Sequence, residues 1–272
     1  MTKMRIWRKP DTMSIVFIVL GAVILLFILV PLLKTIFSSS PGTLWNTLFE
    51  EDVYSSILLT ISAALIATLI GLFLGVPLAY LLARHQFRGK RFLEAIIDVP
   101  IVIPHSAAGV ALLFVFGSSF LGGKVFHSVG IEFFRTFAGV VIAMMFVSVP
   151  FLIDSAKEGF KAVDVRLEKV ARTLGASPWK SFFQISLPLA WRSIFSGSVL
   201  MWARGLSEFG AIVILAYNAS FFGWNTKVLP VLVADRFDFG LDYTRPVAAL
   251  AVLISLVAFV ALRSIAYRGE KA

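Results

Sequence analysis

Long apolar stretches alternate with short polar segments along the chain, which is the pattern of a protein that crosses a membrane several times. A helix needs about 20 apolar residues to span the hydrocarbon core of a bilayer. Six stretches meet this requirement, at residues 13–36, 55–82, 101–121, 136–153, 189–216 and 246–266. The first is long for the apolar region of a secretory signal and lacks an evident cleavage site, so we interpret it as a retained span. We predict an all-α polytopic membrane protein with six transmembrane helices, in which residues 1–272 form one transmembrane domain.

The composition supports this class. Hydrophobic residues make up 58% of the chain and charged residues 15%, against about 25% charged residues in soluble domains. An ordinary soluble enzyme is therefore excluded. The net charge of +9 does not indicate nucleic-acid binding, because the basic residues alternate from loop to loop and do not line one helix face.

The distribution of charge predicts the orientation in the membrane. Cytoplasmic segments collect lysine and arginine. Such residues concentrate at both ends of the chain and after the second and fourth spans: Lys3, Arg5, Arg8, Lys9, Arg84, Arg88, Lys90, Arg91, Lys157, Lys161, Arg166, Lys169, Arg172, Lys180, Arg263, Arg268 and Lys271. Acidic residues lie in or beside the other loops, at Glu50, Glu51, Asp52, Asp235, Asp238 and Asp242. We predict a multi-pass protein of the cell membrane with both termini in the cytoplasm, which requires an even number of spans.

The sequence offers no catalytic site of its own. It contains no G-x-x-x-x-G-K-[ST] nucleotide-binding loop and no H-E-x-x-H metal motif. The chain has no cysteine, and its three histidines lie on separate segments, at His85, His105 and His127. We therefore predict no enzymatic activity, no cofactor and no metal site. Energy for any transport must come from a partner or from an ion gradient.

Residues 154–188 form a polar loop between two apolar spans. Residues typical of helix ends and helix starts within it predict a helix, a sharp turn and a second helix. Gly175 can take the left-handed conformation that ends a helix. Ser177 can cap the next helix, and Pro178 fits its first turn. A structured cytoplasmic loop of this kind is suited to contact a soluble partner. The simpler alternative is an amphipathic helix that lies at the membrane surface.

This loop resembles the cytoplasmic loop of ABC importer permeases, whose motif is Glu-Ala-Ala, three residues, Gly, nine residues, Ile, one residue and Leu-Pro. The spacings of Gly175, Ile185 and Leu187-Pro188 match the motif. Lys169 and Val170 occupy its first two positions, with Glu168 one residue early. The resemblance implies a coupling helix that sits in a cleft of an ATPase subunit. The residues that it assigns to ATPase coupling are Glu168, Lys169, Ala171, Leu174, Gly175, Ala176, Ser177 and Pro178.

The fifth predicted span contains two charges one helical turn apart, Arg204 and Glu208. A charge at the bilayer centre costs at least about 2.5 kcal/mol, so both side chains should face the bundle interior or a water-filled path. Together with Ser207 they are candidates for a pathway or gate. A purely structural ion pair between helices is an equally open alternative. His105 begins the third span, and we expect it to be a local hydrogen-bonding residue.

Two membrane segments are similar to permeases for molybdate, tungstate and sulfate. The first is residues 204–211 followed by Ala216-Tyr217-Asn218, and the second is residues 98–113. The histidine at position 105 makes the second segment more similar to the tungstate/molybdate branch. The resemblance implies a homodimer around one path, two ABC ATPase subunits and an extracytoplasmic oxyanion-binding protein. Three alternatives remain: the same architecture for sulfate or another solute, an ion-driven secondary carrier, and a membrane scaffold without transport activity.

Overall fold

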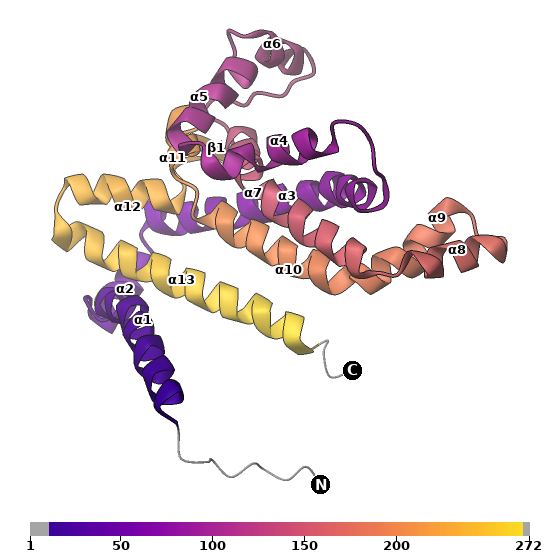
Figure 1. Ribbon diagram of the computed structural model, residues 1–272. Helices are drawn as coiled ribbons and strands as arrows, with labels where there is room; N and C mark the ends of the chain where they lie inside the picture. Colours follow the sequence, from indigo (N-terminus) through magenta and orange to yellow (C-terminus); the bar gives the residue numbers. More distant parts are fainter. Residues whose placement is uncertain (1–10, 269–272) are drawn as a thin grey trace.

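The computed structural model describes residues 11–268, and this part of the chain is almost entirely helical (Figure 1). The predicted basic residues at positions 3, 5, 8, 9 and 271 lie outside the described residues. The elements are α1 (Thr12–Ile36), α2 (Pro41–Leu48), α3 (Glu51–Arg84), α4 (Lys90–Val102), α5 (His105–Phe116), α6 (Leu121–Ser128), α7 (Phe137–Ala162), α8 (Val165–Thr173), α9 (Pro178–Ser181), the π-helix η1 (Phe182–Ser186), α10 (Leu187–Leu206), α11 (Gly210–Leu215), β1 (Ala219–Phe221), β2 (Trp224–Thr226), α12 (Leu229–Asp238) and α13 (Leu241–Arg268). The two strands pair as an antiparallel hairpin.

Among the described residues, four helices are long and apolar enough to cross a membrane: α1, α3, α7 and α13. The bent pair α4 and α5 supplies a fifth span if the two helices are counted together. The predicted count of six is therefore not confirmed by length and composition. The difference arises in the third and fifth predicted spans, both of which are interrupted.

The third predicted span, 101–121, is not one helix. The chain bends by 114° between α4 and α5. Ile103 precedes Pro104 and takes an extended conformation with ψ 146°, as expected for a residue before proline, which is disfavoured in a helix. The fifth predicted span, 189–216, is also divided, because α10 ends at Leu206 and α11 begins at Gly210.

The centre of the bundle is formed by α3, α7 and α10, which lie side by side in Figure 1. Small residues bring these helices close together. A Cβ added at Gly71 of α3 would lie 2.5 Å from the Met201 side chain of α10, and one added at Gly75 would lie 3.2 Å from Ile153 of α7. Such close approach is typical of helices packed in a membrane.

Helix α1 differs from this core, because none of its 25 residues is buried. It runs at the edge of the bundle beside α13 (Figure 1). Its apolar side chains therefore need lipid or another protein to cover them.

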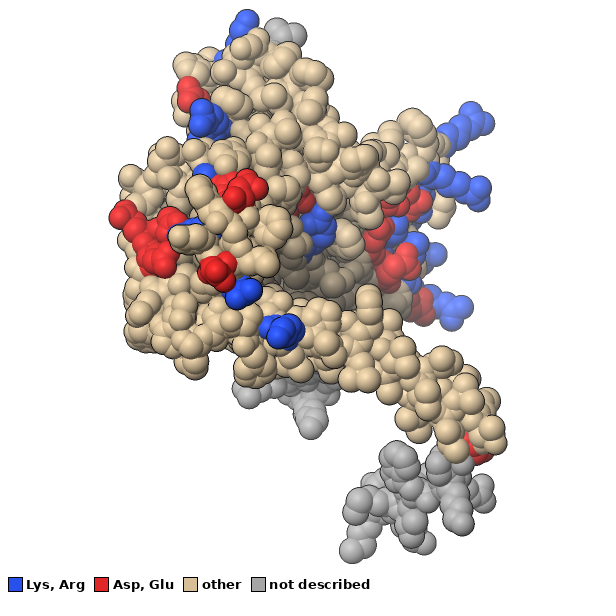
Figure 2. Space-filling model, turned by 90° about the vertical axis from the view of Figure 1, so that its left-hand side faces the viewer, with Lys and Arg blue, Asp and Glu red and all other residues tan. Residues whose placement is uncertain are grey.

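Segments predicted to share a side of the membrane contact one another. Arg236 of α12 pairs with Glu50 and Asp52 at 2.8 and 2.6 Å, which joins two loops predicted to be external. Arg84 pairs with Glu168 at 2.6 Å, which joins two segments predicted to be cytoplasmic. On the face drawn in Figure 2, charged side chains gather in a few patches and leave broad surfaces uncharged.

Candidate functional site

The loop between α8 and α9 has the turn that the sequence predicts. Gly175 adopts φ +90°. Its N–H donates to the carbonyl of Arg172, and the N–H of Ala176 donates to the carbonyl of Ala171, both at 3.0 Å. These two bonds satisfy the last carbonyls of α8 in a Schellman motif. The Ser177 hydroxyl accepts the Lys180 N–H at 3.2 Å and caps α9, so the predicted helix, turn and helix are confirmed.

This turn presents an exposed apolar and basic surface, which we call the loop tip. Leu174 is 83% exposed and Trp179 is 73% exposed. Trp179 stacks on Phe183, with ring centroids 6.0 Å apart. We define the loop tip by seven exposed apolar and basic residues: Lys169, Val170, Arg172, Leu174, Trp179, Lys180 and Phe183. Contiguous exposed apolar side chains with a polar rim are typical of protein contact surfaces.

Glu168 does not belong to the loop tip, although the sequence analysis grouped it with the docking residues. It is only 8% exposed. Its Oε1 accepts from Arg84 Nε at 2.7 Å and from the Ser186 hydroxyl at 2.7 Å, and its Oε2 accepts from the Tyr80 hydroxyl at 3.0 Å. We call these four residues the loop joint. It fastens α8 to the end of α3 and to η1.

The loop joint keeps Glu168 ionised. Burial alone would raise the pKa of this carboxyl, but the hydrogen bonds from Ser186, Arg84 and Tyr80 outweigh burial and lower the pKa below its usual value. The negative charge is therefore held where the guanidinium of Arg84 needs a partner.

The π-helix η1 contributes Ser186 to the loop joint. The N–H of Leu187 donates to the carbonyl of Phe182, five residues earlier, at the end of this wide turn. The ring of Phe182 packs edge-on against Tyr80 at 4.9 Å. Sequence reasoning missed Tyr80 and Ser186, and it used Arg84 only as a topology signal, because these contacts join segments up to 88 positions apart.

A second group of polar residues lies beside the interruption between α10 and α11. We call it the break site, and its members are His105, Arg204, Ser207 and Glu208. Arg204 Nη2 donates to Glu208 Oε2 at 2.9 Å. Arg204 Nη1 donates to the Ser207 hydroxyl at 3.2 Å. The structure thus brings together the three pathway candidates that the sequence named.

Glu208 is fully buried. Its Oε1 accepts the N–H of Ala211 at 2.9 Å. This bond satisfies an otherwise free donor at the start of α11 and accounts locally for the interruption of the helix. The carboxylate therefore has one oxygen committed to the backbone and the other to Arg204.

His105 is the member of the break site that sequence reasoning missed. It was expected to bond locally, but its Nε2 lies 2.6 Å from Arg204 Nη2, a contact across 99 positions of sequence. The only sequence signal is its position directly after Pro104, where the third span breaks. Glycine makes the approach possible: a Cβ at Gly210 would lie 2.8 Å from His105 Cβ, and one at Gly109 would lie 2.8 Å from the Ala211 carbonyl oxygen.

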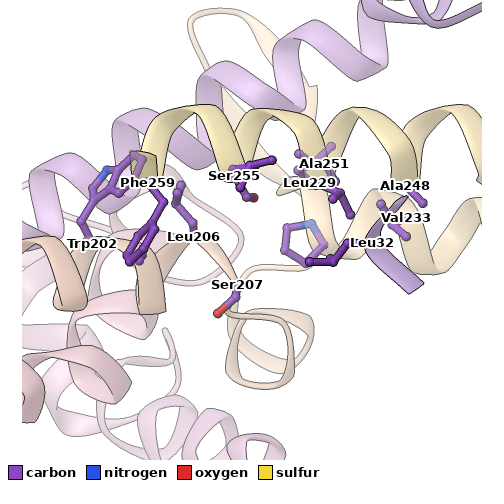
Figure 3. Close-up of a pocket in the computed structure, with 14 residues that line it drawn as sticks. Leu32, Trp202, Leu206, Ser207, Leu229, Val233, Ala248, Ala251, Ser255 and Phe259 are labelled. Atoms are coloured by element: carbon purple, nitrogen blue, oxygen red, sulfur yellow. The ribbon is translucent and has the colours of Figure 1, made fainter. Parts of the chain in front are cut away.

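Beside the break site lies an apolar groove of about 660 Å³ between α10, α12 and α13, with Leu32 of α1 at its edge (Figure 3). Ser207 is among its few polar lining residues, whereas Trp202 and Phe259 present aromatic surface. No group of three or more His, Asp or Glu residues that could hold a metal ion occurs within residues 11–268.

Comparison with known proteins identifies a family and a fold. Residues 75–269 match the family described as binding-protein-dependent transport system inner membrane component. The chain is 41% identical to the molybdate/tungstate transport system permease protein WtpB of Pyrococcus furiosus, over 97% of this chain and 99% of that protein. It is 40% identical to WtpB of Methanocaldococcus jannaschii, over 94% and 96%. It is also 36% identical to a probable sulfate transport system permease protein cysT of Chlorokybus atmophyticus, over 79% and 74%. The resemblance to permeases of the molybdate/tungstate type is confirmed.

Two solved structures share the fold. A bacterial alginate ABC transporter, solved in complex with its alginate pentasaccharide-bound periplasmic protein, matches with a TM-score of 0.72 and 15% identity over 93% of this chain and 94% of that one. The MetNI methionine ABC transporter matches with a TM-score of 0.62 and 14% identity over 85% and 99%. The fold is therefore shared with chains of solved ABC transporters.

Proposed function

Because this chain belongs to the family of binding-protein-dependent transport system inner membrane components, we propose that it is the permease subunit of an ATP-driven importer for molybdate or tungstate. The observation that carries the substrate class is the similarity, over almost the whole chain, to permease proteins of molybdate/tungstate transport systems. Sulfate is the second candidate, since probable sulfate permeases also match. All three oxyanions are tetrahedral dianions, so one site chemistry serves each of them.

The loop tip of each permease copy is the proposed docking surface for one ATPase subunit. Two copies of the permease therefore bind two ATPase subunits. Its exposed apolar side chains and basic rim support this role. Within it, Lys169, Leu174 and Trp179 are the contact residues. Ala171, Gly175, Ala176, Ser177 and Pro178 build the turn that presents them, and Glu168 acts from inside the loop joint.

The break site is the proposed part of the transport path. Arg204 supplies positive potential for a dianion, and Glu208 limits how tightly the dianion is held. Conduction requires binding that permits both entry and release. The exposure of the Arg204 side chain, 22% against 1% for Glu208, supports access from a path. The alternative is a structural ion pair with no contact to substrate.

The assembly that follows is a homodimer in the cell membrane, with both termini and residues 154–188 in the cytoplasm and a binding protein outside. A sixth pass is supplied in this proposal by the interrupted α10–α11 pair. The loop tips move with the ATPase subunits, and rigid-body motion reopens the path outward. No nucleic acid and no cofactor take part.

The test of function is uptake by reconstituted vesicles that contain the permease, its ATPase and a tungstate-binding protein. We expect tungstate uptake to require internal ATP. We also expect excess molybdate to suppress this uptake more strongly than excess sulfate does. Uptake that persists without the ATPase would instead support an ion-driven carrier. Equal suppression by sulfate would favour the sulfate alternative.

The test of topology uses the absence of native cysteine. A cysteine at Asn225, exposed in the β-hairpin, should react with a membrane-impermeant maleimide from outside, whereas one at Lys180, exposed on the loop tip, should react only after permeabilisation. The reverse pattern would overturn the proposed orientation.

A further inference from the structure

The contact between His105 and Arg204 gives the histidine the role of a hydrogen-bond acceptor. A guanidinium only donates hydrogen bonds. Arg204 Nη2 lies 2.6 Å from Nε2 of His105 and 3.4 Å from Nδ1, so the imidazole meets the guanidinium as a neutral acceptor. Nδ1 lies 3.8 Å from Glu208 Oε2, beyond hydrogen-bond distance.

The three charged or polar partners of Arg204 differ in how easily they can be displaced. The Glu208 side chain is 1% exposed and is also bound to the Ala211 N–H. Ser207 is three residues further along the chain and donates back to the Arg204 carbonyl at 3.0 Å. The His105 side chain is 37% exposed and belongs to a different helix. Of the three, His105 is the partner that an incoming ligand can replace with least rearrangement.

His105 also lies across the interruption from Arg204. The glycine contacts pack the start of α5 against the start of α11, so His105 lies beside α11. Arg204 lies in the last turn of α10. The hydrogen bond therefore joins α5 to the last turn of α10, beside the 207–209 segment that Glu208 bridges through Arg204 and Ala211.

We propose that His105 and the transported oxyanion are alternative partners of the same Arg204 N–H, so that the neutral imidazole is a positioning residue that keeps the empty path closed. The proposal rests on the proposed function, because it requires Arg204 to face the path. A dianion outcompetes the imidazole because an ionised acceptor binds the charged guanidinium more strongly than a neutral acceptor does. Displacement of His105 then couples entry of the oxyanion to release of the contact between α5 and α10.

The experiment measures tungstate binding to the permease–ATPase complex by equilibrium dialysis, without the binding protein, whose own site would obscure the permease site. His105→Leu removes the competing acceptor, and we expect tungstate to bind about tenfold more tightly. His105→Gln keeps a neutral acceptor for Arg204, and its affinity should stay close to that of the wild type. The matched control is His127→Gln, at an exposed histidine paired with Glu132 at 3.0 Å, which should change nothing.

The outcomes separate this inference from the proposed function. If the wild-type complex with its binding protein imports tungstate but His105→Leu binds it no more tightly, only the competition between His105 and the oxyanion is overturned. Weaker binding in His105→Leu would show that the imidazole itself holds the oxyanion. If the wild type neither binds nor imports tungstate, and Arg204→Gln behaves identically, the proposed function itself fails.

Discussion

The loop joint and the break site each contain a buried glutamate paired with an arginine, but they are built differently. In the loop joint, Glu168 and Arg84 have side chains 10% and 7% exposed, and the carboxylate receives bonds from α3 and η1. In the break site, the Arg204 side chain is 22% exposed, and its partners include the partly exposed His105. Full enclosure by several elements suits a rigid joint, whereas partial exposure beside a helix interruption suits a part that opens. The predictions below test this difference.

The largest expected effect is on the loop joint. Glu168→Gln removes the charge that Arg84 faces, and removing one partner of a buried ion pair costs about 3–5 kcal/mol of unfolding free energy. Thermal unfolding of the purified protein in detergent measures the loss. The matched control is Glu158→Gln, because Glu158 and Lys161 form an exposed pair of the kind that contributes at most about 1 kcal/mol. Equal effects of the two substitutions would refute the rigid joint.

The second effect tests whether the break site takes part in transport or is only a structural ion pair. Replacing both Arg204 and Glu208 by leucine leaves no unpaired buried charge, so the protein should stay folded. Uptake of tungstate should nevertheless fall at least about tenfold, because a charge-assisted interaction with the dianion is lost. Uptake near the wild-type rate in a stable double variant would mean that the pair is only structural.

A smaller effect is expected at the turn of the loop tip. Gly175 has φ +90°, and an L-residue in the left-handed region costs roughly 1–2 kcal/mol. Gly175→Val should therefore weaken the turn and reduce substrate-stimulated ATP hydrolysis by the assembled complex. Gly21→Val in α1 is the control, since its added Cβ meets nothing within 4 Å. Full stimulation of ATP hydrolysis in the Gly175 variant would show that coupling does not depend on this turn.

The smallest effect is the change with pH in the stability that Glu168 contributes through the loop joint. The folded-state pKa of Glu168 is lowered below the ordinary value of 4.5. Its contribution to stability is therefore complete above the unfolded-state pKa and is lost as the pH falls through the folded-state pKa. The stability difference between wild type and Glu168→Gln should narrow below pH 4.5. Unfolding curves recorded from pH 7 downward provide the measurement, and a constant difference would contradict the bonded, ionised carboxylate.

Local patterns predicted much of this protein. Apolar runs long enough for a bilayer identified α1, α3, α7 and α13, because the hydrophobic requirement of a membrane span is a property of consecutive residues. Gly175, Ser177 and Pro178 predicted the turn of the loop tip, since capping depends on residues within one or two turns. The pairing of Arg204 with Glu208 was also readable, because the two positions are one helical turn apart.

Tertiary structure alone decided where the chain breaks and what meets there. Apolar residues continue through 101–121 and 189–216, so hydropathy does not reveal that Pro104 and the Glu208 carboxylate interrupt these helices. The contact of His105 with Arg204 and the burial of Glu168 likewise depend on helices far apart in sequence. Sequence periodicity specifies which residues avoid water. Which polar groups then satisfy one another inside the bundle is determined by how the helices pack.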